Sequence, residues 1–147
     1  MPHEFSGTTV VDRPIAQVFA FLADGTNDPK FSPRVLEISR SDGPIGVGTI
    51  FTSKVKDAGM TTGRTFELTE VEEPTKIRWT ERSKNLVTVP SGGYDLESIS
   101  ESQTRVTIHN ELVGHRFGKL IVGFAVKAAV KDAPAFAGRI KAAIESS

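Results

Sequence analysis

Residues 103–131, QTRVTIHNELVGHRFGKLIVGFAVKAAVK, change their hydrophobic spacing once, near Gly114. Up to Val113, apolar and polar residues alternate, which is the two-residue period of a half-buried strand. From His115 onward, apolar residues recur every three or four positions, which is the period of an amphipathic helix. The sequence therefore predicts a strand over 103–113 that leads into a long C-terminal helix.

The predicted C-terminal helix has two neighbouring apolar faces. One face consists of Phe117, Leu120, Ile121, Phe124 and Ala128, and the other of Val122, Val126, Ala129, Phe136, Ile140 and Ile144. Pro134 lies inside this segment, where it lacks an N–H and its ring collides with the carbonyl group four residues earlier. We therefore expect a kink or a restart near Asp132, whose side chain could cap the restarted helix.

Upstream, the pattern predicts one strand, two short helices and five further strands. Residues 3–11 are rich in Thr and Val, which favours a first strand. Asp12 is then expected to be a helix N-cap, with Pro14 in the first turn and an apolar stripe after it. A second short helix should end before Pro33. The five strands are predicted at 35–41, 47–56, 62–73, 75–83 and 92–100, separated by turn segments that include 41–44 and 90–93.

The bulk composition excludes several classes of protein. The 147 residues suit one domain, 1–147, with one core. Basic and acidic residues both number 18, so the basic excess of a nucleic-acid-binding protein is missing. There is no cysteine, and the three histidines lack the spacing of metal ligands, so we expect neither a metal nor another cofactor. No signal peptide or membrane-spanning stretch is visible, and a cytoplasmic location is therefore expected.

The element order and five motifs resemble the START/Bet v 1-like (SRPBCC) superfamily. The motifs are RPIAQVFAFLAD at 13–24, PKFSP at 29–33, GPIGVGT at 43–49, PTKIRW at 74–79 and TRVTI at 104–108. Within the superfamily, the chain is most similar to the polyketide cyclase/dehydrase and lipid-transport family. The resemblance implies an α+β helix-grip fold, in which a curved, seven-stranded antiparallel sheet wraps around the long C-terminal helix and leaves a cavity.

Strand alternation predicts which side chains face that cavity. The candidate ligand-binding residues are Phe51, Arg64, Phe66, Trp79, Glu81, Tyr94, Leu96, Ile108 and Asn110 on the sheet, with Phe117, Ile121 and Phe124 on the helix. Apolar walls with a few polar groups are typical of small-molecule pockets. Other interpretations stay open, because Trp79 and Phe66 could simply fill the core and Asn110 could bond to backbone. If Arg64 and Glu81 both point inward, they can pair across the mouth of the cavity.

Three functions are compatible with these patterns. The first is binding or transport of a small hydrophobic molecule, such as a lipid or polyketide, by a monomer or homodimer. The second is a cyclase or dehydratase in which Tyr94, Arg64, Glu81 or Asn110 supplies acid–base or oxyanion contacts. The third is a partner-docking or dimerisation module that uses the apolar helix face. No G-x-S-x-G or phosphate-loop motif points to another enzyme class.

The C-terminal helix is also unusually basic. Residues 115–141 contain Arg116, Lys119, Lys127, Lys131, Arg139 and Lys141, against the single acidic residue Asp132. A basic amphipathic helix can lie on an anionic membrane surface, although a solvated outer helix face has the same composition.

Overall fold

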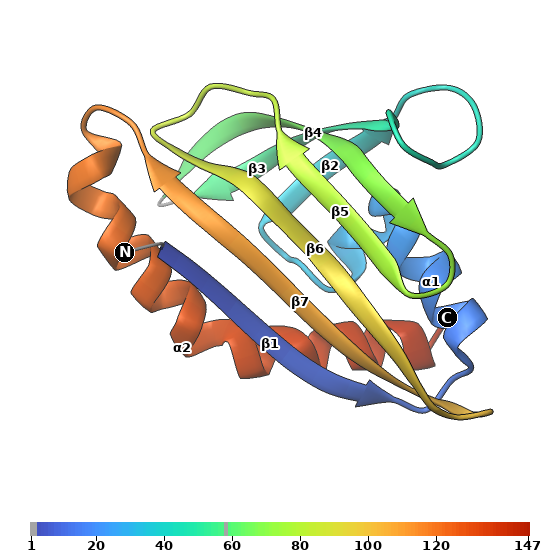
Figure 1. Cartoon of the computed structure of the whole chain (residues 1–147). Coiled ribbons are helices and arrows are strands. Elements are labelled where there is room, and N and C mark those ends of the chain that lie inside the picture. Colours follow the sequence, from blue (N-terminus) through green and yellow to red (C-terminus); the bar gives the residue numbers. More distant parts are fainter. Residues whose placement is uncertain (1–2, 58) are drawn as a thin grey trace.

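A computed structural model describes residues 3–57 and 59–147 (Figure 1). Its elements follow the predicted order. They are β1 (His3–Val11), α1 (Ile15–Ala23), the 3₁₀ helix η1 (Gly25–Lys30), β2 (Val35–Arg40), β3 (Ile50–Asp57), β4 (Met60–Glu72), β5 (Lys76–Glu81), β6 (Val87–Ser100), β7 (Gln103–Gly114) and α2 (Gly118–Glu145). None of the helices in these ranges has the length and hydropathy that crossing a membrane requires.

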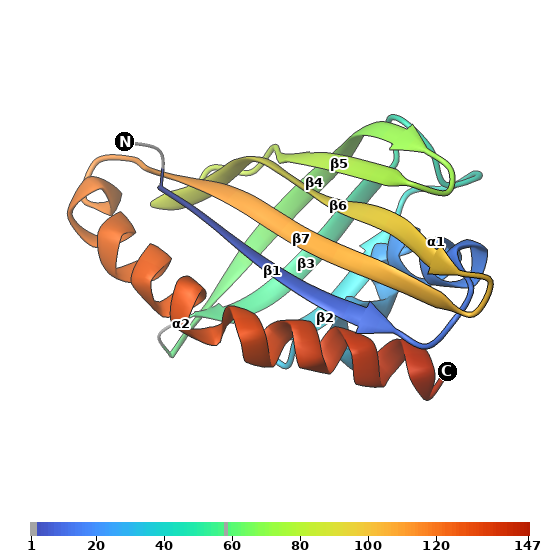
Figure 2. The same cartoon turned by 60° about the horizontal axis from the view of Figure 1, so that its bottom comes forward.

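The seven strands form one antiparallel sheet in the order β1-β7-β6-β5-β4-β3-β2. Strands β2 to β7 follow each other as a meander, and β1 pairs with β7, the last strand. Because β1 and β2 lie at opposite edges, the α1–η1 segment between them crosses one end of the sheet (Figure 1). Helix α2 runs beneath β1 and β7 (Figure 2), which confirms the predicted helix-grip fold.

The hydrophobic core lies at the end of the sheet that α1, η1 and the second half of α2 cover. Its fully buried side chains come from several of these elements and include Val11, Val18, Ile77, Val106, Ile140 and Ile144. The helix approaches β1 closely at Gly7, where a Cβ atom would lie 3.0 Å from the carbonyl oxygen of Ala133. This packed end holds α2 against the sheet.

The predicted turn at 90–93 was wrong, because these residues lie inside β6. That strand begins at Val87 and accommodates a register shift between Thr88 and Ser91. A Cβ atom on Gly92 would lie 2.0 Å from Oδ1 of Asn110. Glycine is therefore required here for close packing of side chains against the strand, and not for a turn.

Two predicted helix caps were also wrong. Helix α1 begins after Pro14 without a side-chain cap, and Asp12 instead accepts a hydrogen bond from Nε2 of Gln103 at 2.9 Å. Helix α2 continues through Pro134 without a restart, and Asp132 forms an ion pair with Arg139 at 2.9 Å. The two halves of α2 nevertheless run in different directions (Figure 2), as expected for a helix that contains proline.

Two glycines of α2 provide a test of how closely the start of this helix packs against the β5–β6 loop. A Cβ atom on Gly118 would lie 1.7 Å from the carbonyl oxygen of Leu86, whereas nothing lies within 4 Å of one on Gly123. We predict that Gly118→Ala lowers the free energy of unfolding by about 1–3 kcal/mol through overpacking. Gly123→Ala, the control, should raise it by up to about 1 kcal/mol through helix propensity. Urea denaturation measures both values, and equal effects would contradict the proposed packing.

Candidate functional site

The concave face of the sheet is packed at one end and open at the other. At the open end, the inward side chains of Phe66, Trp79 and Asn110 are only half-buried. The same side of α2 carries Phe136 at the packed end, where its ring meets Phe31 at a centroid distance of 5.7 Å. Towards the N-terminus of the helix, that stripe continues through Ala129, Ala125, Ile121 and Gly118. These mostly small side chains leave space beside the sheet.

An open hollow of about 710 Å³ lies at this end of the molecule. Its lining comes from the β5–β6 loop, the start of β6 and the turn before α2, and consists of Ser83, Lys84, Asn85, Leu86, Thr88, His115 and Arg116. The hydroxyl group of Thr88 contacts Nε2 of His115 at 2.8 Å and so joins the strand to the turn. A volume of this size falls in the range of small-molecule sites.

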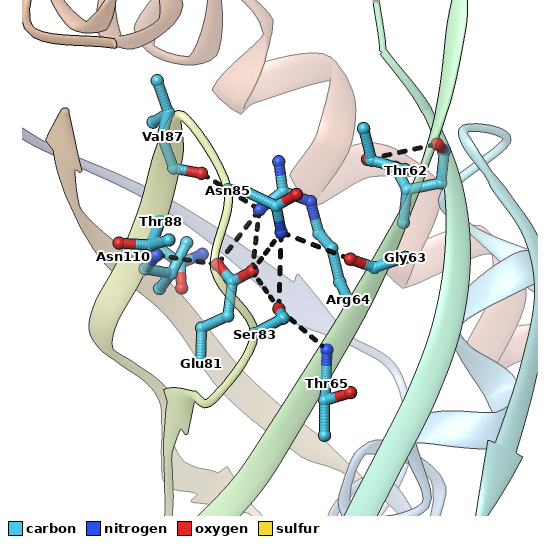
Figure 3. A network of polar contacts seen from close by, with 12 residues as sticks. Thr62, Gly63, Arg64, Thr65, Glu81, Ser83, Asn85, Val87, Thr88 and Asn110 are labelled. Carbon is cyan, nitrogen blue, oxygen red and sulfur yellow. Dashed lines mark hydrogen bonds and ion pairs between the residues drawn. The ribbon is translucent and has the colours of Figure 1, made fainter. Parts of the chain in front are cut away.

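A buried ion pair lies behind the loop that lines the hollow, in a network of polar contacts (Figure 3). Arg64 on β4 donates to both carboxylate oxygens of Glu81 on β5, each at 3.0 Å, and the Glu81 side chain is fully buried. Glu81 also accepts hydrogen bonds from Ser83, Asn85 and the backbone N–H of Val89. The expected Arg64–Glu81 pair therefore exists. Because so many donors already bind this carboxylate, it fixes the loop that lines the hollow and is poorly placed to act as an acid or base.

The aromatic wall of the site is also held by a polar contact. Nε1 of Trp79 donates to Oδ1 of Asn110 at 3.0 Å, so this amide bonds to a side chain and not to the backbone. The ring of Tyr94 meets Trp79 edge to face, with a centroid distance of 5.1 Å. Trp79, Tyr94 and Asn110 thus form one rigid surface on the concave side of β5, β6 and β7.

Two polar groups near this surface lack hydrogen-bond partners. Within the described ranges, every fully buried side-chain nitrogen or oxygen has a partner. The hydroxyl group of Tyr94 and the carboxyl group of Asp28 have none there, although Tyr94 is only 4% exposed. Both groups must therefore border space that a water molecule can reach. Sequence reasoning missed Asp28, because it stands in a stretch of turn-forming residues and carries no motif.

The electrostatics of these two groups are linked. Burial, and then the charge of Asp24, raises the pKa of Asp28 to about 7. Burial, and then the charge of Asp28, raises the pKa of Tyr94 well above its usual value. The two groups therefore lie close enough to influence each other. Near neutral pH, Asp28 can donate or accept a hydrogen bond, and Tyr94 remains a donor.

The remaining predicted site residues fall into three groups. Phe51, Leu96 and Ile108 belong to the packed core, with exposures of 5% each. Phe117 and Phe124 are about three-quarters exposed, at 75% and 74%. They do not join the sheet residues, because Gly118 and Val122 are the residues that α2 turns towards the sheet. Ile121, which is 45% exposed, lies at the edge of the open end.

The described parts of the chain, 3–57 and 59–147, contain no group of three or more His, Asp or Glu residues that could hold a metal ion. The features that the candidate site does contain are a half-buried aromatic surface, a loop fixed by the Arg64–Glu81 pair, and two polar groups without a hydrogen-bond partner.

Together, the antiparallel sheet and the long helix form a helix-grip fold. The family model for polyketide cyclase/dehydrase and lipid transport matches residues 2–145, so the chain belongs to that family. None of the curated proteins matches the chain in sequence.

Several solved structures share this fold. The Zhui aromatase/cyclase from Streptomyces sp. R1128 has a TM-score of 0.80 at 14% identity, over 99% of this chain and 93% of that chain. TTHA0849 from Thermus thermophilus has a TM-score of 0.77 at 15% identity, over 97% of each chain. The Polyketide_cyc-like protein Cgl2372 from Corynebacterium glutamicum has a TM-score of 0.66 at 22% identity, over 96% of this chain and 90% of that chain. At such identities the similarity shows the fold and leaves the chemistry open.

The raised pKa of Asp28 predicts how stability depends on pH. The folded protein binds the Asp28 proton more tightly than the unfolded chain, whose pKa is near 3.8. The contribution of this proton to stability is complete below about pH 4 and is lost as pH rises through about 7. Asp28→Asn should therefore weaken the fall in stability between about pH 5 and pH 8. Urea midpoints at both pH values measure this effect, with Asp42→Asn in the exposed β2–β3 loop as the control. An unchanged slope in Asp28→Asn would refute the assignment.

Proposed function

We propose that this protein binds a small, largely apolar molecule between the open end of the sheet and the first half of α2, next to the hollow that the β5–β6 loop lines. One observation carries this proposal. An aromatic surface is left half-covered at that end, and where it meets the packed core the hydroxyl group of Tyr94 and the carboxyl group of Asp28 have no hydrogen-bond partner among the described residues. A bound molecule would cover the aromatic surface and could form hydrogen bonds with Tyr94 and Asp28.

The proposed ligand has an apolar body with at least one oxygen atom. Covering apolar surface stabilises a complex by roughly 25 cal/mol per Å². A hydroxyl or carbonyl group on the ligand could bond to Tyr94 and Asp28, which would otherwise keep water in the site. Lipids and polyketides have this combination of an apolar body and oxygen atoms, and the description of the family names both kinds of chemistry.

Each wall of the site has a different role in this proposal. Trp79 and Phe66 contact the body of the guest from the sheet, and Ile121 contacts it from the helix. The Arg64–Glu81 pair holds the loop at the mouth in place. Phe51, Leu96 and Ile108 support the floor from the packed core, and Phe117 and Phe124 could meet a guest only at the outer rim.

Binding of naphthalene and 2-naphthol tests the proposal, because these probes differ by one hydroxyl group. Both should bind at a single site, and 2-naphthol should bind roughly fivefold more tightly, since one net hydrogen bond contributes about 1 kcal/mol. Tyr94→Phe should reduce this preference and leave naphthalene binding in place. Titration calorimetry gives the two dissociation constants, with Ser98→Ala on an exposed part of β6 as the control.

Failure of both probes to bind would overturn the ligand-binding proposal. If the wild type bound naphthalene and 2-naphthol with equal affinity, the role of the two polar groups would be rejected. The proposal of an apolar site would remain.

A cyclase or dehydratase is a second candidate, and Asp28 is the observation that favours it. A carboxyl group with a pKa of about 7 beside a tyrosine hydroxyl can exchange protons with a bound ketone or enol. An enzyme of this kind would consume a linear β-triketone faster than buffer alone, and Asp28→Asn would abolish that acceleration. A binding protein would return the triketone unchanged, as followed by liquid chromatography.

A further inference from the structure

The first half of α2, together with the residue before it, has an outer face of large apolar side chains that are mostly exposed. We define this outer face by Phe117, Leu120 and Phe124, whose side chains are 75%, 75% and 74% exposed. Leu120 and Phe124 lie on the opposite side of the helix from Val122, which is 5% exposed and faces the sheet. Three large apolar side chains are thus presented to solvent within about two helical turns, which is unusual for a monomeric surface.

The charged residues of the first half of α2 and of the turn before it are all basic. Arg116, Lys119, Lys127 and Lys131 are exposed, and no acidic residue occurs between 115 and 131. None of these four cations forms an ion pair within the described ranges. At about 100° per residue, Lys127 and Lys131 lie on the same side of the helix as Leu120 and Phe124. The apolar residues are therefore flanked by unneutralised positive charge.

The β5–β6 loop extends this surface next to the hollow. The carbonyl oxygen of Leu86 accepts a hydrogen bond from the backbone N–H of His115 at 2.7 Å, which holds the loop against the start of α2. The side chain of Leu86 is 50% exposed, and Lys84 beside it is also exposed. Leu86, Lys84 and Arg116 line the hollow as well, so the outer face and the mouth of the candidate site adjoin each other.

The chemistry of this surface selects between possible partners. In a symmetric dimer the outer face would meet a copy of itself, and the lysines of both copies would approach each other without a counter-charge. A lipid bilayer with anionic headgroups provides both complements, because the acyl region takes up apolar side chains and the headgroups attract Lys and Arg. We propose that the outer face of α2, together with Leu86, binds an anionic membrane surface and places the mouth of the hollow at the lipid.

Vesicle co-sedimentation of the full chain tests this proposal. The protein should bind vesicles of phosphatidylcholine mixed with phosphatidylserine, and binding to pure phosphatidylcholine should be at least tenfold weaker. Because each basic residue near an anionic surface contributes about 1 kcal/mol, Lys127→Gln with Lys131→Gln should weaken binding roughly 30-fold. Leu120→Ala should weaken it about tenfold through loss of buried apolar area.

The controls are an exposed lysine and an exposed apolar residue away from α2. Lys56→Gln on β3 and Val47→Ala in the β2–β3 loop should bind the mixed vesicles as the wild type does. The proposal would be overturned if the wild type did not bind the mixed vesicles. It would also be overturned if both α2 variants bound them as tightly as the wild type does. A concentration-dependent dimer in sedimentation that Leu120→Ala dissociates would overturn it too, because a second copy would then cover the face.

The vesicle experiment stands apart from the probe titration. A protein that binds naphthalene but not vesicles has the ligand site without the membrane surface, and the reverse result removes only the ligand site.

Discussion

The first turn of α2 rests on the carbonyl group of Leu86 through Gly118, and this contact sets how the helix is rotated about its axis. With Gly118 and Val122 turned towards the sheet, Ala125 and Ala129 follow on the inner side, while Leu120 and Phe124 point outward. The inner side therefore lacks the bulk to fill the space beside Trp79. The small side chains on the inner side and the exposed outer face are thus two consequences of one backbone contact.

The architecture could be predicted from the sequence because it depends on periodicity. The period of β7 and its change before α2 are visible in residues 103–131, and the inward positions of Trp79, Tyr94 and Ile108 follow from alternation. The rotation of α2 could not be predicted in the same way. Two apolar stripes compete for the inner position, and the choice depends on a glycine-to-carbonyl contact between segments distant in sequence. Asp28 was missed for a related reason, since only tertiary burial gives it its chemical character.

The polar groups of the site divide into anchored and available ones. Glu81 and Asn110 were candidates for ligand contact, but their side chains hold Arg64 and Trp79. Breaking such an existing hydrogen bond to contact a ligand costs free energy. These side chains therefore determine the shape of the site more than its affinity for a ligand. Tyr94 and Asp28 have no such engagement, and the specificity of the proposed site depends on them. Family membership and fold are consistent with either binding or catalysis, so these two groups decide between the functions.

The central claim is that a guest can occupy the space between the open end of the sheet and the first half of α2. A crystal structure with 1-bromonaphthalene tests it most directly, because the anomalous signal of bromine locates the ligand without bias from the protein. We predict a bromine peak within contact of Trp79 and on the Ile121 side of α2. A saturated crystal with no peak there, and with side chains closing the gap, would contradict it.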